Sequence, residues 1–193
     1  MKDFTQWPVI GRGNERVCYQ NPDDPSRCVK VSRKEKSKQS QREIRYFQYL
    51  VKRQVAFTHI PRFYSVIQTD RYLGLEQERV LDSQGNQPPD LYHYLCQPLS
   101  NKQQREFWLA MDMLKDYLIR YNIIPCDLVM SNILVVEGID KTKVIMIDGF
   151  GGAEWIPIAN YVRFLGKRKI ERKWQKFVED FITPCFKNNQ IIK

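Results

Sequence analysis

Three polar residues with the chemistry of a metal and phosphate site lie close together in the stretch "PCDLVMSNILVVEGIDKTKVIMIDGFGG": Asp127, Asn132 and Asp148. Two short β-rich runs, residues 133–137 and 143–147, separate Asn132 from Asp148. An aspartate can orient or deprotonate a hydroxyl group. Mg²⁺ requires oxygen ligands, which carboxylate and amide side chains can provide. The spacing therefore predicts a β-hairpin with a candidate Mg²⁺ ligand at each end and a candidate catalytic aspartate just before it.

Each of the three residues also has a purely structural explanation. Asp127 can form a turn, Asn132 can act as a cap, and Asp148 can end a strand. A glycine-rich turn follows Asp148, which suits a carboxylate that holds a metal on a phosphate. The joint spacing of the three residues favours the chemical interpretation over three separate structural ones.

The N-terminal half contains candidate residues for binding a phosphate. Gly11 and Gly13 lie between two predicted strands in "VIGRGNERVCY", and glycine lets the backbone approach a phosphate closely because it has no Cβ. Lys30 stands in an apolar strand, and Glu43 lies on the apolar side of a predicted helix. A carboxylate in that position is costly unless it is paired. We therefore expect Lys30 to pair with Glu43; the alternative is two exposed charges in a highly charged region.

Hydrophobic periodicity predicts the elements that position these residues. The first half reads as about five strands and one helix, the helix covering about residues 38–54. The most linker-like segment is "LDSQGNQPPD", and two helical stretches, the hairpin and, from about Ile158, a basic helix follow it. The predicted organisation is an N-terminal lobe of residues 1–80, a hinge or linker of residues 81–90 and an abbreviated C-terminal lobe of residues 91–193.

The order of these features resembles the protein-kinase-like fold. More narrowly, the chain is similar to the YrbL family of bacterial proteins, described as part of the PhoP regulatory network. The match, over about residues 8–180, is carried by "GRGNERVCYQNPDD", "CVKV", "REIRYFQYL", "DLVMSNILV" and "MIDGFGGAEWIPIANYVRFLGKRKIERKWQKF". The resemblance implies an α+β fold with a five-stranded antiparallel N-terminal sheet, one helix on it, and a shortened, mostly helical C-terminal lobe.

The resemblance also implies ATP and Mg²⁺ as cofactors and a role for each candidate residue. Gly11 and Gly13 would lie over the nucleotide phosphates, and Lys30, held by Glu43, would contact the α- and β-phosphates. Leu75–Val80 would be the hinge against the adenine, mostly through backbone groups. The hinge residues expected to bind the cofactor are Glu76, Gln77 and Glu78. The catalytic residue would be Asp127, and the metal ligands would be Asn132 and Asp148.

The chain departs from the kinase pattern in four places. Arg16 stands near the position of the third glycine of the phosphate loop, Pro125-Cys126 replaces the His-Arg before the catalytic aspartate, and Gly149 lengthens the Asp-Phe-Gly motif. No Ala-Pro-Glu-like segment follows. The expected function is an ATP- and Mg²⁺-dependent phosphotransferase whose acceptor is a small molecule or the protein itself rather than a peptide. The alternative is a non-catalytic nucleotide-binding regulatory or interaction protein, a pseudokinase.

The charge of the chain limits the classes of partner that it is expected to bind. The net charge is +9, with two basic clusters at residues 30–42 and 167–176. Such clusters favour acidic partners such as nucleotides, or they are simply solvated helix faces. Only Trp174 and Phe177 offer aromatic stacking near the second cluster, so nucleic acid is not an expected partner.

The cysteines and the hydropathy of the chain argue against a metal-stabilised, disulfide-stabilised or membrane-spanning protein. The five cysteines are scattered without a Cys-x-x-Cys pair, and there are only two histidines, which argues against a zinc site or a disulfide framework. No apolar run approaches the roughly 18 residues of a membrane span. The first residues lack the apolar core of a signal peptide, so we expect a cytoplasmic location.

Overall fold

The computed structural model describes residues 4–13, 15–138, 141–150 and 163–186. These residues form two compact units. The first, called the sheet unit here, contains the described residues of Met1–Phe57 and Pro61–Val80. The second, called the hairpin unit, contains the described residues of Thr58–Ile60, Leu81–Phe150 and Glu154–Lys193.

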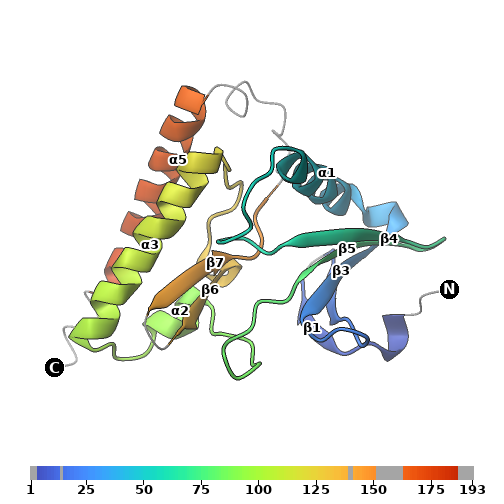
Figure 1. Cartoon of the computed structure of the whole chain (residues 1–193), viewed down its shortest axis with the longest axis horizontal. Helices are drawn as coiled ribbons and strands as arrows, with labels where there is room; N and C mark the ends of the chain where they lie inside the picture. The colour runs from blue at the N-terminus through green and yellow to red at the C-terminus, as the bar shows by residue number, and fades with distance from the viewer. Residues whose placement is uncertain (1–3, 14, 139–140, 151–162, 187–193) are drawn as a thin grey trace. The chain divides into compact units, whose positions relative to one another are not determined.

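The sheet unit consists of five antiparallel strands with one α-helix on them, as expected (Figure 1). The strand order is β1-β2-β3-β5-β4, and α1 packs against β3, β4 and β5. The strands are β1 Val9–Arg12, β2 Val17–Gln20, β3 Arg27–Arg33, β4 Phe63–Gln68 and β5 Tyr72–Glu78. The helical segments are η1 Phe4–Gln6, η2 Lys34–Lys36 and α1 Lys38–Lys52.

The central strand β3 is buried on both faces, which explains why its residues are apolar on one side and include a lysine on the other. Val29 and Val31 pack on Phe4 beneath the sheet. On the opposite face α1 buries its apolar stripe, and the Phe47 ring stacks on Phe63 with 6.0 Å between centroids. Because successive residues of a strand point to opposite faces, Lys30 lies on the face that α1 covers.

The hairpin unit combines helices with the predicted β-hairpin. Helix α3 packs on β7 and α5, and the two helices run side by side (Figure 1). The N-terminus of α3 has a capping box between Ser100 and Gln103, and the helix ends at Asn122, which has a φ of 51°. The elements are α2 Leu91–Leu95, α3 Asn101–Tyr121, η3 Met130–Asn132, β6 Ile133–Glu137, β7 Thr142–Met146, α5 Arg163–Phe177 and the π-helical turn η4 Val178–Ile182.

None of the five cysteines, all of which belong to the described residues, forms a disulfide. No helix in the described parts of the chain is both long enough and apolar enough to cross a bilayer.

His59 makes the stability of the hairpin unit depend on pH. Its ring is 7% exposed, and Nδ1 donates a hydrogen bond to the Val144 carbonyl over 2.9 Å. Burial lowers the pKa of His59 below its usual 6.5, because the charged imidazolium loses its hydration. The contribution of the neutral ring is therefore complete above pH 6.5, the pKa of the unfolded chain, and declines as the pH falls below it.

We expect the urea concentration at the midpoint of unfolding to decrease when the pH is lowered from 7.5 to about 5.5, a range that spans the reference pKa of histidine. His59→Gln can donate the same hydrogen bond without titrating, so this variant should show a smaller fall. The exposed histidine offers the control, because His93→Gln should leave the His59 contribution intact. An unchanged pH dependence in His59→Gln would contradict the assignment.

Candidate functional site

Lys30 and Glu43 form the buried ion pair predicted from the sequence. Lys30 Nζ lies 3.1 Å from Glu43 Oε1, and the two side chains are 9% and 1% exposed. Strand β3 aims Lys30 at α1, and the helix presents Glu43 one turn before Phe47 on its buried side. Neither charge would be tolerated there alone, because an unpaired buried charge costs several kcal/mol. The pair therefore fixes the amine of Lys30 in one place.

Arg16 is a third member of this cluster, and the sequence did not predict it. Its Nη1 donates to Glu43 Oε2, so the carboxylate uses both oxygens, one for each cation. The backbone of Arg16 closes the glycine-rich turn, because its carbonyl accepts the N–H of Gly13 over 2.8 Å. Arg16 thus ties the turn between β1 and β2 to α1. The only sequence signal was a basic residue where a third glycine was expected.

Gly11, which lies in β1 opposite Cys18, and Gly13, which lies in the turn, are not required by packing. A Cβ at Gly11 would lie 3.7 Å from Cys18 Cβ, and one at Gly13 would lie 3.7 Å from the Arg16 carbonyl, both ordinary contacts. Neither glycine has a positive φ. Their smallness therefore serves something other than the internal contacts of the sheet unit, and close approach of a ligand to the backbone is consistent with it.

Two of the three predicted hinge side chains are engaged within the sheet. Glu76 is buried and accepts hydrogen bonds from Asn21 Nδ2 over 2.9 Å and Ser65 Oγ over 2.7 Å. Glu78 accepts the backbone N–H of Arg62 over 3.1 Å. Their carboxylates therefore hold β5 against its neighbours. The backbone of this segment is engaged as well, because β5 pairs with β3 on one side and with β4 on the other.

Gln77 differs from its two neighbours in the strand. It lies opposite Cys28 in the β3–β5 ladder, as Leu75 lies opposite Lys30, so Gln77 and Lys30 share one face of the sheet. Its Oε1 is buried and accepts no hydrogen bond from the described residues. Such an orphaned acceptor costs roughly 1–3 kcal/mol. The position therefore suits a ligand with an amino group.

The thiol of Cys28 lies on the same face. A hydrogen bond with Cys18, followed by burial, raises its pKa well above the usual value. A thiol in this environment stays protonated and behaves as a small apolar group.

In the hairpin unit, Asn132 and Asp148 stand at the same end of β6 and β7. Ile133 pairs with Met146, and the carbonyl of Asn132 accepts the N–H of Ile147 over 2.8 Å. Asn132 Nδ2 also donates to the Asp127 carbonyl, 3.3 Å away. The hairpin thus returns the chain to Asn132 one residue before Asp148, as predicted, and Asn132 contacts the segment that carries Asp127.

Gly149 connects the end of the hairpin to the segment that carries Asp127. It thereby links two departures from the kinase pattern, the inserted glycine and the Pro125-Cys126 pair. Its φ is +91°, and its N–H donates to Asp148 Oδ1 over 2.7 Å. Its carbonyl accepts the N–H of Cys126 over 2.9 Å and the thiol of Cys126 over 2.8 Å. A Cβ at this position would overlap the Asp127 carbonyl oxygen. The hydrogen bonds between Gly149 and Cys126 therefore hold these two segments together.

Lys173 of α5 also supports this loop. Its Nζ donates to the carbonyls of Pro125 and Cys126, at 2.8 and 3.1 Å. The sequence placed this lysine in a basic cluster without a structural role. Here at least one charge of that cluster fixes the backbone immediately before Asp127.

The donor set fits Mg²⁺ rather than a metal held by protein groups alone. The described residues contain no cluster of three or more His, Cys, Asp or Glu side chains that could hold a metal. Mg²⁺ typically binds one or two carboxylates, waters and the phosphates of its substrate. Asn132 and Asp148 together provide a set of that kind.

A five-stranded sheet with one helix and a buried Lys–Glu pair, followed by an Asp-x₄-Asn hairpin that ends in Asp-Gly, defines a protein-kinase-like fold. The crystal structure of Rad53 1–466 in complex with AMP-PNP has this fold in common with the chain, with a TM-score of 0.58 and 19% identity. The similarity covers 76% of this chain and 38% of that one.

The chain belongs to the family of the PhoP regulatory network protein YrbL, whose model matches residues 3–181. Its relatives include the uncharacterized protein YrbL of Escherichia coli (strain K12), which is 28% identical over 174 residues. The similarity covers 88% of this chain and 82% of that protein. The YrbL protein of Shigella flexneri matches to the same extent.

Proposed function

We propose that the protein is an ATP- and Mg²⁺-dependent phosphotransferase that acts on a small-molecule hydroxyl or on itself. The observation that carries this proposal is the buried Lys30–Glu43 pair, which holds one ammonium group in a fixed position on the sheet. A protein gains little stability from such a pair compared with apolar residues of similar volume. Retention of the pair is explained if its lysine is held in place to bind a phosphate.

The other residues of the sheet unit suit the rest of a nucleotide. Gly11 and Gly13 leave backbone room that phosphates would use. The orphaned Oε1 of Gln77 would accept a hydrogen bond from the amino group of adenine. Each of these contacts is a proposal that the geometry of the sheet unit supports.

In the hairpin unit, Asp127 would act on the acceptor. As the acceptor oxygen bonds to phosphorus, Asp127 takes the hydroxyl proton and the bridging P–O bond to ADP breaks. Asn132 and Asp148 would hold Mg²⁺, which neutralises charge on the phosphates when bound. Gly149 and Lys173 both hold the backbone immediately before Asp127.

The second candidate is a nucleotide-binding protein without turnover, and Arg16 is the observation that favours it. A basic side chain pairs with Glu43 at the place where the kinase pattern has a glycine. The family description, a regulatory network protein, agrees with a sensing role.

Nucleotide binding tests both candidates, and Lys30→Met is the decisive variant. We expect AMP-PNP with Mg²⁺ to raise the melting temperature of the wild type. Lys30→Met should weaken the affinity at least about tenfold, because a charge-assisted contact to phosphate is worth 1.5–3 kcal/mol. The variant should still fold, since Glu43 keeps Arg16 as a partner. The exposed Lys36 provides the control: Lys36→Met should bind as the wild type does.

Turnover separates the candidates. Formation of ADP from ATP that requires Mg²⁺ supports the phosphotransferase. Binding of AMP-PNP that depends on Lys30, with no ADP formed in the presence of sugars, amino alcohols or the protein alone, supports the non-catalytic protein. Absence of any nucleotide-dependent stabilisation contradicts both.

A further inference from the structure

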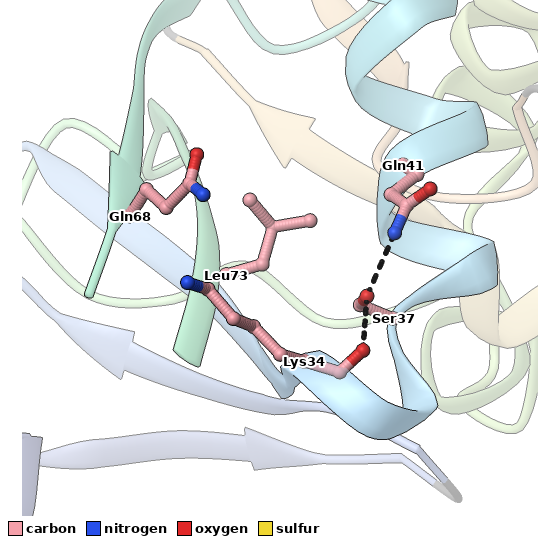
Figure 2. A pocket seen from close by; sticks show the side chains of 5 residues that line it. All are labelled: Lys34, Ser37, Gln41, Gln68 and Leu73. Carbon is pink, nitrogen blue, oxygen red and sulfur yellow. Dashed lines mark hydrogen bonds between the residues drawn. The ribbon is translucent and has the colours of Figure 1, made fainter. Parts of the chain in front are cut away.

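The sheet unit contains a cavity of about 470 Å³ that the proposed nucleotide contacts do not use. Figure 2 shows Leu73 between two groups of polar side chains, Lys34 and Gln68 on one side and Ser37 and Gln41 on the other. These five residues come from β4, β5, the start of α1 and the segment before it. The volume lies within the usual range for small-molecule sites, roughly 300–1,000 Å³.

The lining has the chemistry of an anion site. Four of the five side chains are polar, one of these four is a cation, and none is acidic. Ser37 is only 2% exposed, and it donates to the Lys34 carbonyl over 2.7 Å while it accepts Gln41 Nε2 over 3.0 Å (Figure 2). These bonds hold one wall of the cavity in place before a ligand arrives.

The charge around the cavity also favours an anionic ligand. The cavity opens within the first basic cluster, and the ten residues 33–42 include five basic residues and one acidic residue. Within the described part of the chain, Lys34 is exposed and forms no ion pair. The sequence left open whether this cluster meets an acidic partner or is a solvated face. A cavity with a cation at its edge favours the partner.

We propose that this cavity binds a small phosphate-bearing metabolite of about the size of a sugar phosphate. Lys34 receives the phosphate as a point charge, and the amides of Gln41 and Gln68 bind the polar remainder above Leu73. Bare phosphate is too small to contact both walls of a cavity of this volume.

Binding here would act on the Lys30–Glu43 pair, a consequence that rests on the proposed function. Gln41 and Glu43 belong to the same helix, α1, and the opposite wall of the cavity belongs to the sheet. A ligand that joins the two walls restrains α1 where it holds Glu43 against Lys30. The metabolite and the nucleotide should therefore raise each other's affinity by one common factor, typically 5- to 150-fold for coupled sites.

Calorimetric titration of the full chain with glucose 6-phosphate and with inorganic pyrophosphate tests the site. We expect glucose 6-phosphate to bind, and Lys34→Glu and Gln41→Trp each to weaken it at least about tenfold, or 1.4 kcal/mol. The first variant reverses the charge, and the second fills the cavity without changing charge. Lys36→Glu makes the same charge change on a lysine that does not line the cavity, and it should keep most of the affinity.

Several outcomes would overturn the site. They are no heat with either probe, equal weakening by Lys36→Glu and Lys34→Glu, or full affinity in Gln41→Trp. Co-sedimentation with phosphatidylglycerol vesicles that requires Lys34, without binding of glucose 6-phosphate, would assign the phosphate to a lipid headgroup and overturn the metabolite. Lys30→Met should retain glucose 6-phosphate binding, which separates this cavity from the nucleotide contacts.

The coupling has its own readout. If AMP-PNP does not bind at all, the proposed function fails while glucose 6-phosphate binding still supports the cavity site. If both ligands bind and neither changes the affinity of the other, the site stands and its link to Glu43 through α1 is overturned.

Discussion

Asp127→Asn is expected to lower the rate of ADP formation by about 100- to 10,000-fold, the usual contribution of a general base. Asparagine keeps the shape of the side chain and cannot take a proton. The contact with Asn132 uses the backbone carbonyl of Asp127, so the substitution leaves it in place. The affinity for AMP-PNP with Mg²⁺ should therefore change little, and the loss should fall on kcat.

Initial rates with ATP and Mg²⁺, together with a thermal titration of AMP-PNP, measure the two effects separately. Asp112 is an exposed aspartate of α3, and Asp112→Asn is a control with the same change of charge. Asp148→Asn should also lower the rate, and it should shift the Mg²⁺ concentration needed for half-maximal activity upward. Wild-type turnover in both Asp127→Asn and Asp148→Asn would show that the hairpin residues take no part in the chemistry.

Gly149→Ala is expected to destabilise the protein by about 2–4 kcal/mol and to abolish turnover. A non-glycine residue at a positive φ costs about 1–3 kcal/mol. In addition, the new Cβ would overlap the Asp127 carbonyl oxygen and lie 2.9 Å from Met146 Cε. The backbone must therefore move at the residue that carries the proposed catalytic group. For a chain of this size, the loss corresponds to a fall in melting temperature of roughly 4–16 °C.

Gly85 provides a matched control because it has almost the same backbone conformation in open surroundings. Its φ is +82°, and a Cβ there would meet no atom within 4 Å. Gly85→Ala should therefore cost only the backbone strain, about 1 kcal/mol, and leave activity unchanged. Equal losses of stability in the two variants, with activity retained in both, would mean that the close contact between Gly149 and Asp127 does not contribute to activity.

The elements and the Lys30–Glu43 pair were accessible from the sequence because each leaves a local signal. Alternation and helical spacing predict the five strands, α1 and the hairpin. A charge on the apolar side of a strand or helix must find a partner nearby, and Lys30 and Glu43 were close candidates in the chain. The register of β6 and β7 then follows from the short hairpin, which returns the chain to Asn132 just before Asp148.

The residues that the sequence missed act across long separations and through backbone groups. Arg16 reaches Glu43 over 27 positions, and Lys173 reaches the Pro125 carbonyl over 48. Nothing in the residue types marks a basic side chain as a partner for one particular carboxylate or carbonyl. The cavity beside Lys34 likewise depends on how α1, β4 and β5 pack, which periodicity does not specify.

The sequence by itself determined the order of the elements, the kinase-like pattern and the residue types that could do phosphate chemistry. Only the tertiary structure decided that Arg16 shares Glu43 with Lys30, that the inserted Gly149 connects Cys126 to Asp148, and that Glu76 and Glu78 hold the sheet. The physical reason is that hydrophobic patterning specifies which face of each element is buried. Which polar group meets which other is decided by the packing of elements distant in the chain.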